Sequence, residues 1–308
     1  MATLAETQAK SGAVAPVRVV HADASEVLRF AAGGSVELAY LDPPFNVGAE
    51  FAARTRSGEG RGRATQGSGP TAYDDRWPSL ESYLAWLEVR VAAARETLSL
   101  AGTLWLHLDY RAAHEAKGVC DRVFGKEAYL GEVIWVPGNG SKRRRGPGVT
   151  HQTLLIYARG KDFVWNAADP ALRTSFASTS LSMHFKTTDQ EGRAYRDRTV
   201  NGKTYRYYAD AGKTLGSVWT DCPSMIANTP IHAEGTGYPT QKPLKLLDRI
   251  VRASSRPGAL VLDPFCGSGT TLCAAAQCGR TAIGLDIGEL AIKVTRERLE
   301  RLGISLVR

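Results

Sequence analysis

Two hydrophobic periods alternate along this chain. Short apolar runs, the pattern of buried strands, are separated by stretches in which apolar residues recur on one face of a helix. The apolar runs predict strands at residues 17–22, 36–41, 102–109, 131–136, 151–159, 259–265 and 281–287. The other stretches predict helices at residues 24–32, 79–98, 112–124, 242–254, 270–279 and 288–303. This order favours a mostly parallel sheet with helices on both faces, the doubly wound α/β class.

Three segments interrupt this pattern. Residues 1–16 are small and mixed in polarity, with neither a basic start nor an apolar core, so we expect a disordered tail rather than a signal peptide. Residues 53–70 hold too few apolar side chains to pack, and we expect a flexible loop. Residues 160–238 are irregular, and the regular pattern resumes only at residue 242. This long segment therefore reads as an insertion.

Composition narrows the class of protein. With 308 residues, 43% of them hydrophobic, the chain can build one large domain with an insertion, or two domains. No apolar run approaches the roughly 18 residues of a membrane span. The five cysteines form no C-x-x-C pair and have no histidine at metal-ligand spacing, so we expect reduced thiols, no metal and a cytoplasmic protein. The net charge of +8 is compatible with binding to nucleic acid but does not establish it.

The strand at 259–265 runs into the sequence LVLDPFCGSGTT. Asp263 closes the strand, Gly267 and Gly269 follow in the turn, and a helix opens at Thr270. Glycines in such a turn let a ligand approach the backbone, and a helix N-terminus offers unpaired N–H groups. A phosphate-binding loop would place a lysine after the glycines, and none follows here. The acid at Asp263 suits a cationic ligand, and a nucleoside with a cationic tail is S-adenosylmethionine.

The next strand supplies a second acid. Asp286 lies near the end of the strand at 281–287, where an acid takes the ribose hydroxyls in nucleotide-binding α/β folds. The alternative to a ligand site is that these strand ends are only tight turns, each with an aspartate on the surface.

The strand at 36–41 ends in LDPPFN. Asp42 precedes Pro43 and Pro44, which carry C=O but no N–H groups, so this turn presents acceptors. An exocyclic amino group brings two donors, and Phe45 adds a flat face on which a base could stack. A structural turn is the alternative for D-P-P alone. Because ligands of open α/β sheets bind at the carboxyl ends of strands, the two motifs together favour one ligand site.

These motifs resemble those of the DNA amino-methyltransferases, which modify adenine N6 or cytosine N4. The stretch Asp42-Pro43-Pro44-Phe45 is similar to their D-P-P-[YF] motif, and Phe265, Gly267 and Gly269 match their adenosylmethionine motif, F-x-G-x-G. The catalytic motif comes first and the cofactor motif last, as in the β group of these enzymes.

The resemblance covers roughly residues 17–110 and 235–303, and it includes TGYPTQKPLKLLDRIV at 236–251. It implies a Rossmann-like methyltransferase sheet that is circularly permuted. The chain would begin with the third strand of the family's sheet, run through the seventh, and then supply the first and second. Asp23 ends that third strand, so it is expected near the adenine end of the cofactor, and it also suits the N-cap of the next helix.

The resemblance also implies roles for the residues. Asp42 and the Pro43 carbonyl would accept the amino hydrogens of a base flipped out of the duplex and stacked on Phe45, which exposes the nitrogen lone pair to the methyl donor. No covalent enzyme intermediate is needed. S-adenosylmethionine would be bound by Asp23, Asp263, Phe265, Gly267, Gly269, Thr270 and Asp286.

Basic residues cluster outside the sheet pattern. We expect DNA contacts from Arg54, Arg56, Lys142, Arg143, Arg144 and Arg145. Taken singly, each basic cluster could instead be a solvated loop that makes no contact with DNA. The expected organisation is a catalytic half at 17–137, a target-recognition region inserted at 138–235 and a cofactor-binding half at 236–308.

The favoured function is therefore site-specific methylation of double-stranded DNA, with adenine N6 as the target because an acid-first motif is the usual adenine form. Cytosine N4 is the alternative, although many cytosine enzymes have serine at this position. Methylation of RNA or of a protein amide is less favoured, because a related N-P-P-Y motif would be expected there, and Asp42 in place of asparagine counts against the protein form. Nucleic-acid binding by a dead site is less favoured because Asp42, Asp263 and Asp286 are intact. A homodimer and a cognate restriction nuclease stay open as partners.

Overall fold

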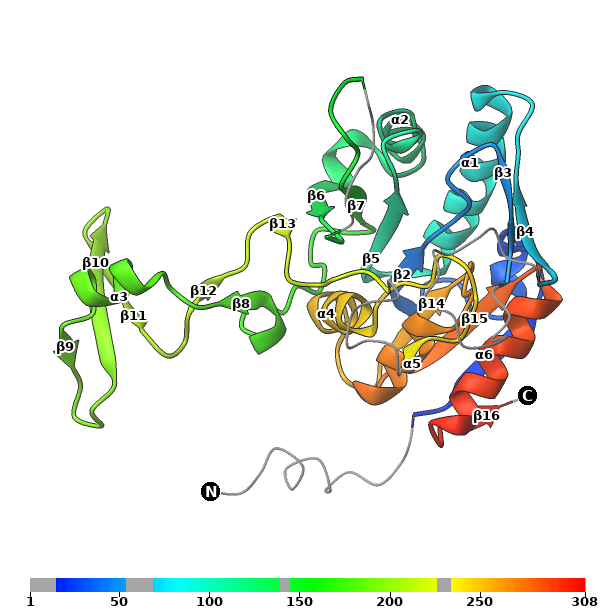
Figure 1. The fold of residues 1–308 in the computed structure, drawn as a ribbon. Helices are drawn as coiled ribbons and strands as arrows, with labels where there is room; N and C mark the ends of the chain where they lie inside the picture. The colour runs from blue at the N-terminus through cyan, green and yellow to red at the C-terminus, as the bar shows by residue number, and fades with distance from the viewer. Residues whose placement is uncertain (1–14, 54–68, 139–144, 226–233, 308) are drawn as a thin grey trace, which may run out of the picture.

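A nine-stranded sheet forms the centre of the molecule (Figure 1). The computed structural model describes residues 15–53, 69–138, 145–225 and 234–307. The strands of the sheet are β1 (Val17–His21), β2 (Val36–Leu41), β5 (Leu98–Leu108), β6 (Tyr129–Trp135), β7 (Gln152–Ala158), β13 (Val218–Trp219), β14 (Leu260–Asp263), β15 (Thr281–Asp286) and β16 (Leu306–Val307).

The strand order β13-β6-β7-β5-β2-β14-β15-β1-β16 confirms the predicted circular permutation. Strand β14, from near the end of the chain, lies between β2 and β15, and β1 pairs with the other side of β15. These pairs are parallel, whereas β7 runs antiparallel to β5 and β6. The carboxyl ends of β2, β14 and β15 therefore meet at one edge of the sheet, although they come from opposite ends of the sequence.

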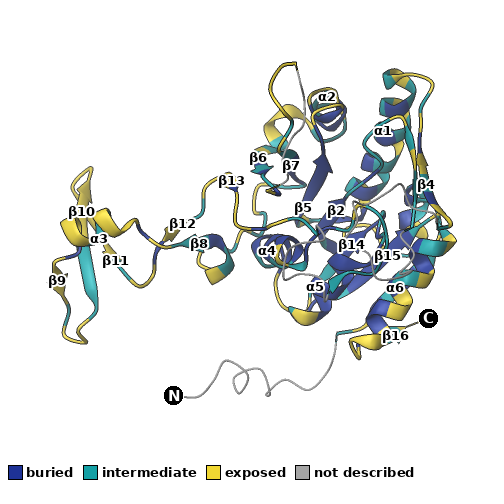
Figure 2. Ribbon diagram, viewed as in Figure 1, coloured by how far each residue is buried: buried dark blue, intermediate teal, exposed yellow. Residues whose placement is uncertain are grey.

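Helices cover both faces of the sheet (Figure 2). They are α1 (Leu80–Thr97), α2 (Ala113–Phe124), α4 (Leu244–Ser254), α5 (Thr270–Gln277) and α6 (Glu289–Arg301). One hydrophobic core packs α4, α5 and α6 against Leu38 and Tyr40 of β2. The other packs α1 and α2 against Ala39 and Leu41 of the same strand. Successive side chains of a strand point to opposite faces, so this division confirms the doubly wound architecture.

Two elements differ most from the sequence prediction. The helix expected at 24–32 is a short 3-10 helix, η1 (Ala24–Arg29). Strand β5 begins at Leu98, directly after the last residue of α1, so it is longer than the predicted 102–109. A second 3-10 turn, η2 (Lys126–Ala128), links α2 to β6.

A small hairpin that the sequence did not predict lies beside the carboxyl ends of the central strands. It pairs β3 (Ala49–Ala52) with β4 (Thr71–Asp75), and the rings of Phe51 and Tyr73 stack with centroids 4.9 Å apart. The predicted flexible loop at 53–70 connects these strands, and most of it lies outside the described residues, as does most of the predicted tail at 1–16.

Within the segment predicted as irregular, 160–238, residues 170–214 form an arm that projects from the body of the molecule (Figure 1). Its elements are η3 (Pro170–Leu172), β8 (Arg173–Thr174), α3 (Ser178–His184), β9 (Thr187–Thr188), β10 (Ala194–Val200), β11 (Lys203–Tyr208) and β12 (Lys213–Thr214). Strands β10 and β11 form an antiparallel hairpin at the far end. Their residues are mostly exposed, so they lack the apolar alternation that marks a strand in a sequence.

The root of the arm is fixed to α4 by Arg249. This buried guanidinium donates to both oxygens of the Asp221 carboxylate, at 2.8 and 2.6 Å, and its Nε donates to the Ala171 carbonyl at 2.9 Å. It also lies 4.9 Å from the centroid of Trp219. Both ends of the arm are thus held against α4, the helix that precedes β14.

Two general expectations can be compared with the fold. All five cysteines are unpaired, and four of them are buried. Within the described ranges, we find no helix with the length and apolar character required to cross a bilayer.

Candidate active site

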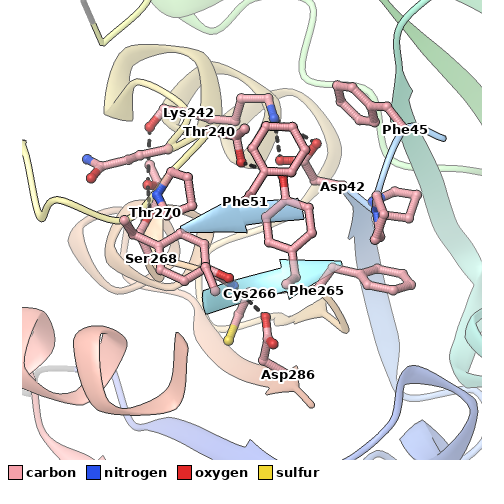
Figure 3. A pocket seen from close by; sticks show the side chains of 18 of the residues that line it. Asp42, Phe45, Phe51, Thr240, Lys242, Phe265, Cys266, Ser268, Thr270 and Asp286 are labelled. Atoms are coloured by element: carbon pink, nitrogen blue, oxygen red, sulfur yellow. Dashed lines mark hydrogen bonds and ion pairs between the residues drawn. The ribbon is translucent and has the colours of Figure 1, made fainter. Parts of the chain in front are cut away.

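A cavity of about 910 Å³ opens at the edge of the sheet where β2, β14 and β15 end (Figure 3). The sequence predicted eleven catalytic and cofactor-binding positions, and ten of them line this cavity: Asp23, Asp42, Pro43, Pro44, Phe45, Asp263, Phe265, Gly267, Thr270 and Asp286. The remaining one, Gly269, lies in the turn beneath it. The two motifs therefore share one chamber.

Gly269 is required by its backbone and its neighbours. Its φ is +73°, in the left-handed region, and it forms the N-cap of α5. A Cβ atom placed there would lie 2.7 Å from Cγ2 of Thr295. No other residue fits without moving α6. Gly269 thus shapes the turn rather than lining the cavity.

Asp263 is buried at the end of β14, where its carboxylate accepts a hydrogen bond from the Phe265 N–H at 3.0 Å. Burial raises the pKa of Asp263 to about 7, although hydrogen bonds from Thr271 and the Phe265 N–H oppose the rise. The charges of Asp42 and Asp286 contribute to this raised value. A group with this pKa is poised to ionise when a cation arrives.

Asp286 closes β15 and ties two turns together. Its Oδ2 accepts from the Gly267 N–H at 2.9 Å and its Oδ1 from the Gly288 N–H at 2.8 Å. Burial raises the pKa of Asp286, and these two backbone hydrogen bonds oppose the rise. A carboxylate has about four lone-pair sites, so both oxygens keep capacity for ligand hydroxyls.

Asp23 is the N-cap that the sequence predicted, and it also borders the cavity. It caps η1, accepting from the Ser25 N–H at 2.8 Å, and it lines the cavity. An ion pair with Arg90, at 2.7 Å, holds its other oxygen. Thr270 lines the cavity as well, but its hydroxyl is already used, donating to the Lys242 carbonyl and accepting from Arg298.

The turn after β2 is organised by Asp75, which the sequence reading missed. This buried carboxylate of β4 accepts from the backbone N–H groups of Phe45, Asn46 and Val47 at 3.0, 2.7 and 3.1 Å. The arrangement allows Asn46 to adopt a left-handed φ of +58°. The Tyr83 hydroxyl donates to the Pro44 carbonyl at 2.8 Å. Backbone and side chains together fix the direction in which Asp42 and Phe45 point.

Lys242 is the second residue that the sequence reading missed. Its ammonium donates to both oxygens of Asp42, at 2.7 and 2.5 Å, and the two side chains are 8% and 17% exposed. Figure 3 shows this pair at the top of the cavity. Burial raises the pKa of Asp42, and the Lys242 charge opposes that rise. The only available signal was its place in TGYPTQKP, a segment noted for its resemblance but not assigned a role.

Phe45 lies between the ion pair and the interior of the sheet. Its centroid is 5.0 Å from the Lys242 ammonium and 5.9 Å from the ring of His107. Phe45 also lines the cavity, so part of its ring remains accessible to a ligand.

Five of the six predicted DNA contacts, Arg54, Arg56, Lys142, Arg143 and Arg144, lie outside the described residues. The sixth, Arg145, is exposed. In the part of the chain that the structure covers, no three His, Cys, Asp or Glu side chains are grouped so that they could hold a metal ion.

Comparison with known proteins agrees with this geometry. M.EcaI, a type II methyltransferase of Enterobacter cloacae, is 27% identical over 86% of this chain, which spans 65% of the length of M.EcaI. The DNA adenine methyltransferase YhdJ of Escherichia coli is 26% identical over 92% of this chain and 82% of its own length.

The fold has a solved counterpart. TTHA0409, a candidate DNA modification methylase of Thermus thermophilus solved in complex with S-adenosyl-L-methionine, superimposes with a TM-score of 0.56 at 20% identity. The superposition covers 95% of this chain and 98% of that one. At this identity the likeness shows the fold.

A family model described as DNA methylase, of the N6/N4 type, matches residues 36–297. This match spans both strand-end motifs, the arm and the hairpin that carries Asp75. The chain therefore belongs to the N6/N4 DNA methylase family, whose enzymes transfer methyl groups from S-adenosylmethionine to exocyclic amino groups of DNA bases.

Proposed function

We propose that this protein methylates the exocyclic amino group of a base flipped out of duplex DNA, with adenine N6 as the favoured target. The observation that carries the proposal is that the turn at Asp42 and the turn at Asp263 open into one cavity. A methyl donor held by the second turn would meet an amino group held by the first. With this function, we expect the protein to be located in the cytoplasm.

The target amino group needs two acceptors, and the turn after β2 offers them. Lys242 donates to each oxygen of Asp42, which leaves lone pairs on the carboxylate for the amino group. The Pro44 carbonyl is taken by Tyr83, whereas no group among the described residues donates to the Pro43 carbonyl. We therefore assign the two hydrogen bonds of the amino group to Asp42 and Pro43. They draw its lone pair out of conjugation, and Asp42 stabilises the positive charge that develops on nitrogen.

The other side of the cavity fits S-adenosylmethionine. Asp263, a buried acid whose pKa is raised to about 7, suits the cationic methionine part, and Asp286 keeps lone pairs for the ribose hydroxyls. Asp23 would lie toward the adenine, with Phe265 and Gly267 lining the wall. When bound, S-adenosylmethionine supplies a methyl group activated by a sulfonium.

Adenine is favoured by the acid at Asp42 and by the similarity to YhdJ, which is an adenine enzyme. Cytosine N4 is the second candidate, because the family comprises both types. Nucleoside analysis of methylated DNA distinguishes N6-methyladenine from N4-methylcytosine.

We further propose that residues 138–235 form the target-recognition region between a catalytic half at 17–137 and a cofactor-binding half at 236–308. Arg54, Arg56 and the run Lys142–Arg145 would contact phosphates in this scheme. Among the described residues, the hairpin of the arm offers the clearest surface for DNA.

The two faces of this hairpin differ in charge. On one face Arg206 pairs with Asp197 at 2.9 Å, and Thr199 bonds Thr204 at 3.0 Å, so the polar groups satisfy one another. The register places on the opposite face Arg196, Arg198, Val200, Lys203, Tyr205 and Tyr207. That face contains no acid. Exposed cations beside exposed tyrosines suit a phosphate backbone.

The first prediction concerns catalysis. Asp42→Ala should abolish transfer of labelled methyl from S-adenosylmethionine to duplex DNA, a fall of at least about 100-fold, because the acceptor for the amino group is lost. Cofactor affinity measured by calorimetry should stay nearly unchanged. RNA and protein substrates serve as controls for the wild type. Turnover by Asp42→Ala, or label appearing only in RNA or protein, would refute the assignment.

The second prediction concerns Lys242. Lys242→Met removes the charge that opposes the raised pKa of Asp42, so this pKa rises further and Asp42 ionises only at higher pH. The acid limb of the kcat profile should therefore move to higher pH, by about one unit or more. Lys242→Arg keeps the charge and should leave the limb in place. A lower kcat with an unmoved limb would mean that Lys242 only packs.

The third prediction concerns cofactor binding. The pKa of Asp263 is raised to about 7, so the acid is largely protonated at pH 6 and largely ionised at pH 8. A cationic ligand binds the ionised form better, and the affinity for S-adenosylmethionine should rise as pH increases through 7. Calorimetry from pH 6 to 8 measures this slope. Asp263→Asn should flatten it, and an equal slope in both proteins would rule out Asp263 as the titrating group.

The fourth prediction concerns the hairpin. Replacing Arg198 and Lys203 together by serine should lower the slope of log affinity for duplex DNA against log salt by about two. The matched control is Asp197→Asn with Arg206→Gln, which removes an acid and a base from the opposite face and leaves net charge unchanged. A similar slope in all three proteins would exclude this face as a phosphate contact.

A further inference from the structure

A half-buried amide on the cavity lining has no role in the scheme above. Gln152, the first residue of β7, lines the same cavity as Asp42 and Phe45. Its Oε1 is buried and makes no hydrogen bond within the described part of the chain. The side chain thus borders the cavity, while its amide oxygen is buried in the protein.

The protein side of this amide is His107. His107 is opposite Leu154 in the β5–β7 ladder, and Gln152 lies two residues before Leu154, so both side chains are on one face of the sheet. The ring of Trp135, opposite Gln152 on β6, packs edge-on against His107 at 5.5 Å. His107 is fully buried, and its Nε2 also has no partner among the described residues.

The tautomer of His107 follows from Tyr40. The buried Tyr40 hydroxyl lies 2.7 Å from His107 Nδ1, which is its one hydrogen-bond partner in the described structure. A buried hydroxyl hydrogen needs an acceptor, so Tyr40 donates to Nδ1. Burial, and then the Lys242 charge, lower the pKa of His107 well below its ordinary value, while the Gln152 amide opposes them. The neutral ring therefore carries its proton on Nε2, the atom that faces the Gln152 oxygen.

This chain of donors fixes the direction of the amide. A proton on His107 Nε2 needs an acceptor and favours the rotamer of Gln152 that turns Oε1 inward. The two amide hydrogens of Gln152 then point into the cavity. Tyr40 and His107 thus convert Gln152 into a donor with one orientation.

The position of this donor matches the target base. Strand β5 lies between β2 and β7, so Gln152 is two strands from the Asp42 turn, about 10 Å across the sheet. Both residues are at the same edge, because β7 runs antiparallel and begins where β2 ends. Phe45 lines the cavity that they share.

We propose that Gln152 donates a hydrogen bond to the ring nitrogen beside the exocyclic amino group of the flipped base. This inference rests on the function proposed above and does not depend on the choice of base, because adenine N1 and cytosine N3 are both acceptors next to an amino group. Guanine and thymine carry an N–H at the corresponding position, which would meet the amide hydrogens as a second donor. Gln152 is thus a residue that selects the amino-bearing edge, while Asp42 and Pro43 hold the amino group itself.

The test uses the full-length protein and a duplex containing its target site, located beforehand by mapping methylated positions in DNA from cells that express it. In a second duplex the target base is replaced by 1-deazaadenine, or by 3-deazacytosine if the target is cytosine. This exchange keeps the amino group and replaces the ring nitrogen by C–H. Wild-type protein should methylate the deaza duplex about 10- to 100-fold more slowly in single turnovers, the loss typical of one buried hydrogen bond.

Gln152→Leu separates the proposed contact from general effects on the site. It should be slow on the natural duplex and no slower on the deaza duplex, because the contact is already lost. Gln152→Glu should regain rate as pH falls, since only the protonated acid can donate. Thermal unfolding and cofactor affinity of each variant check that the site is intact.

The outcomes are distinguishable. A deaza penalty of equal size in wild type and Gln152→Leu overturns the role of Gln152 and leaves the proposed function standing. No methylation of any natural duplex by wild-type protein overturns both.

Discussion

The ion pair between Asp42 and Lys242 joins residues that are 200 positions apart in the chain, and the proposed catalytic site depends on it. A carboxylate removed from water tends to take up a proton, and a protonated Asp42 would lose acceptor capacity that its proposed contact with a target amino group requires. Lys242 opposes this tendency because it brings a buried positive charge to both oxygens. Removing either partner would leave the other buried without compensation, so the pair also couples the start of α4 to the end of β2.

Two other acids of the cavity lining, Asp286 and Asp263, are compensated differently. Asp286 has two backbone N–H groups, from Gly267 and Gly288, which are fixed by the fold. Asp263 has one N–H and the Thr271 hydroxyl, and its pKa stays near 7. Its charge is thus the least compensated of the three. A cationic ligand would supply the positive charge that Asp263 lacks. In the proposed scheme, this gives the site an electrostatic preference for S-adenosylmethionine, the cofactor of the family.

The sequence predicted much of this site because strand ends have a simple signature. Asp42, Asp263 and Asp286 each follow an apolar run, and parallel strands bring such ends to one edge of a sheet. Asp75 has no such signature. It belongs to a two-strand hairpin interrupted by a polar loop, and its function depends on three backbone N–H groups that no side-chain pattern records. The hairpin of the arm was missed for a related reason, since exposed strands held by cross-strand pairs such as Asp197 and Arg206 show no apolar alternation.

Gln152 illustrates a limit of the strand-end rule itself. The rule searches for polar residues after a strand, because parallel strands deliver their carboxyl ends to the ligand. Strand β7 is antiparallel to its neighbours, so it delivers its first residue to the same edge. A polar residue at the start of an apolar run, as in the predicted strand at 151–159, gives no sign of a ligand site under that rule. In this fold the direction of one strand turns that position into part of the cavity wall, and the buried Tyr40–His107 pair behind it supplies the polarity that the position needs.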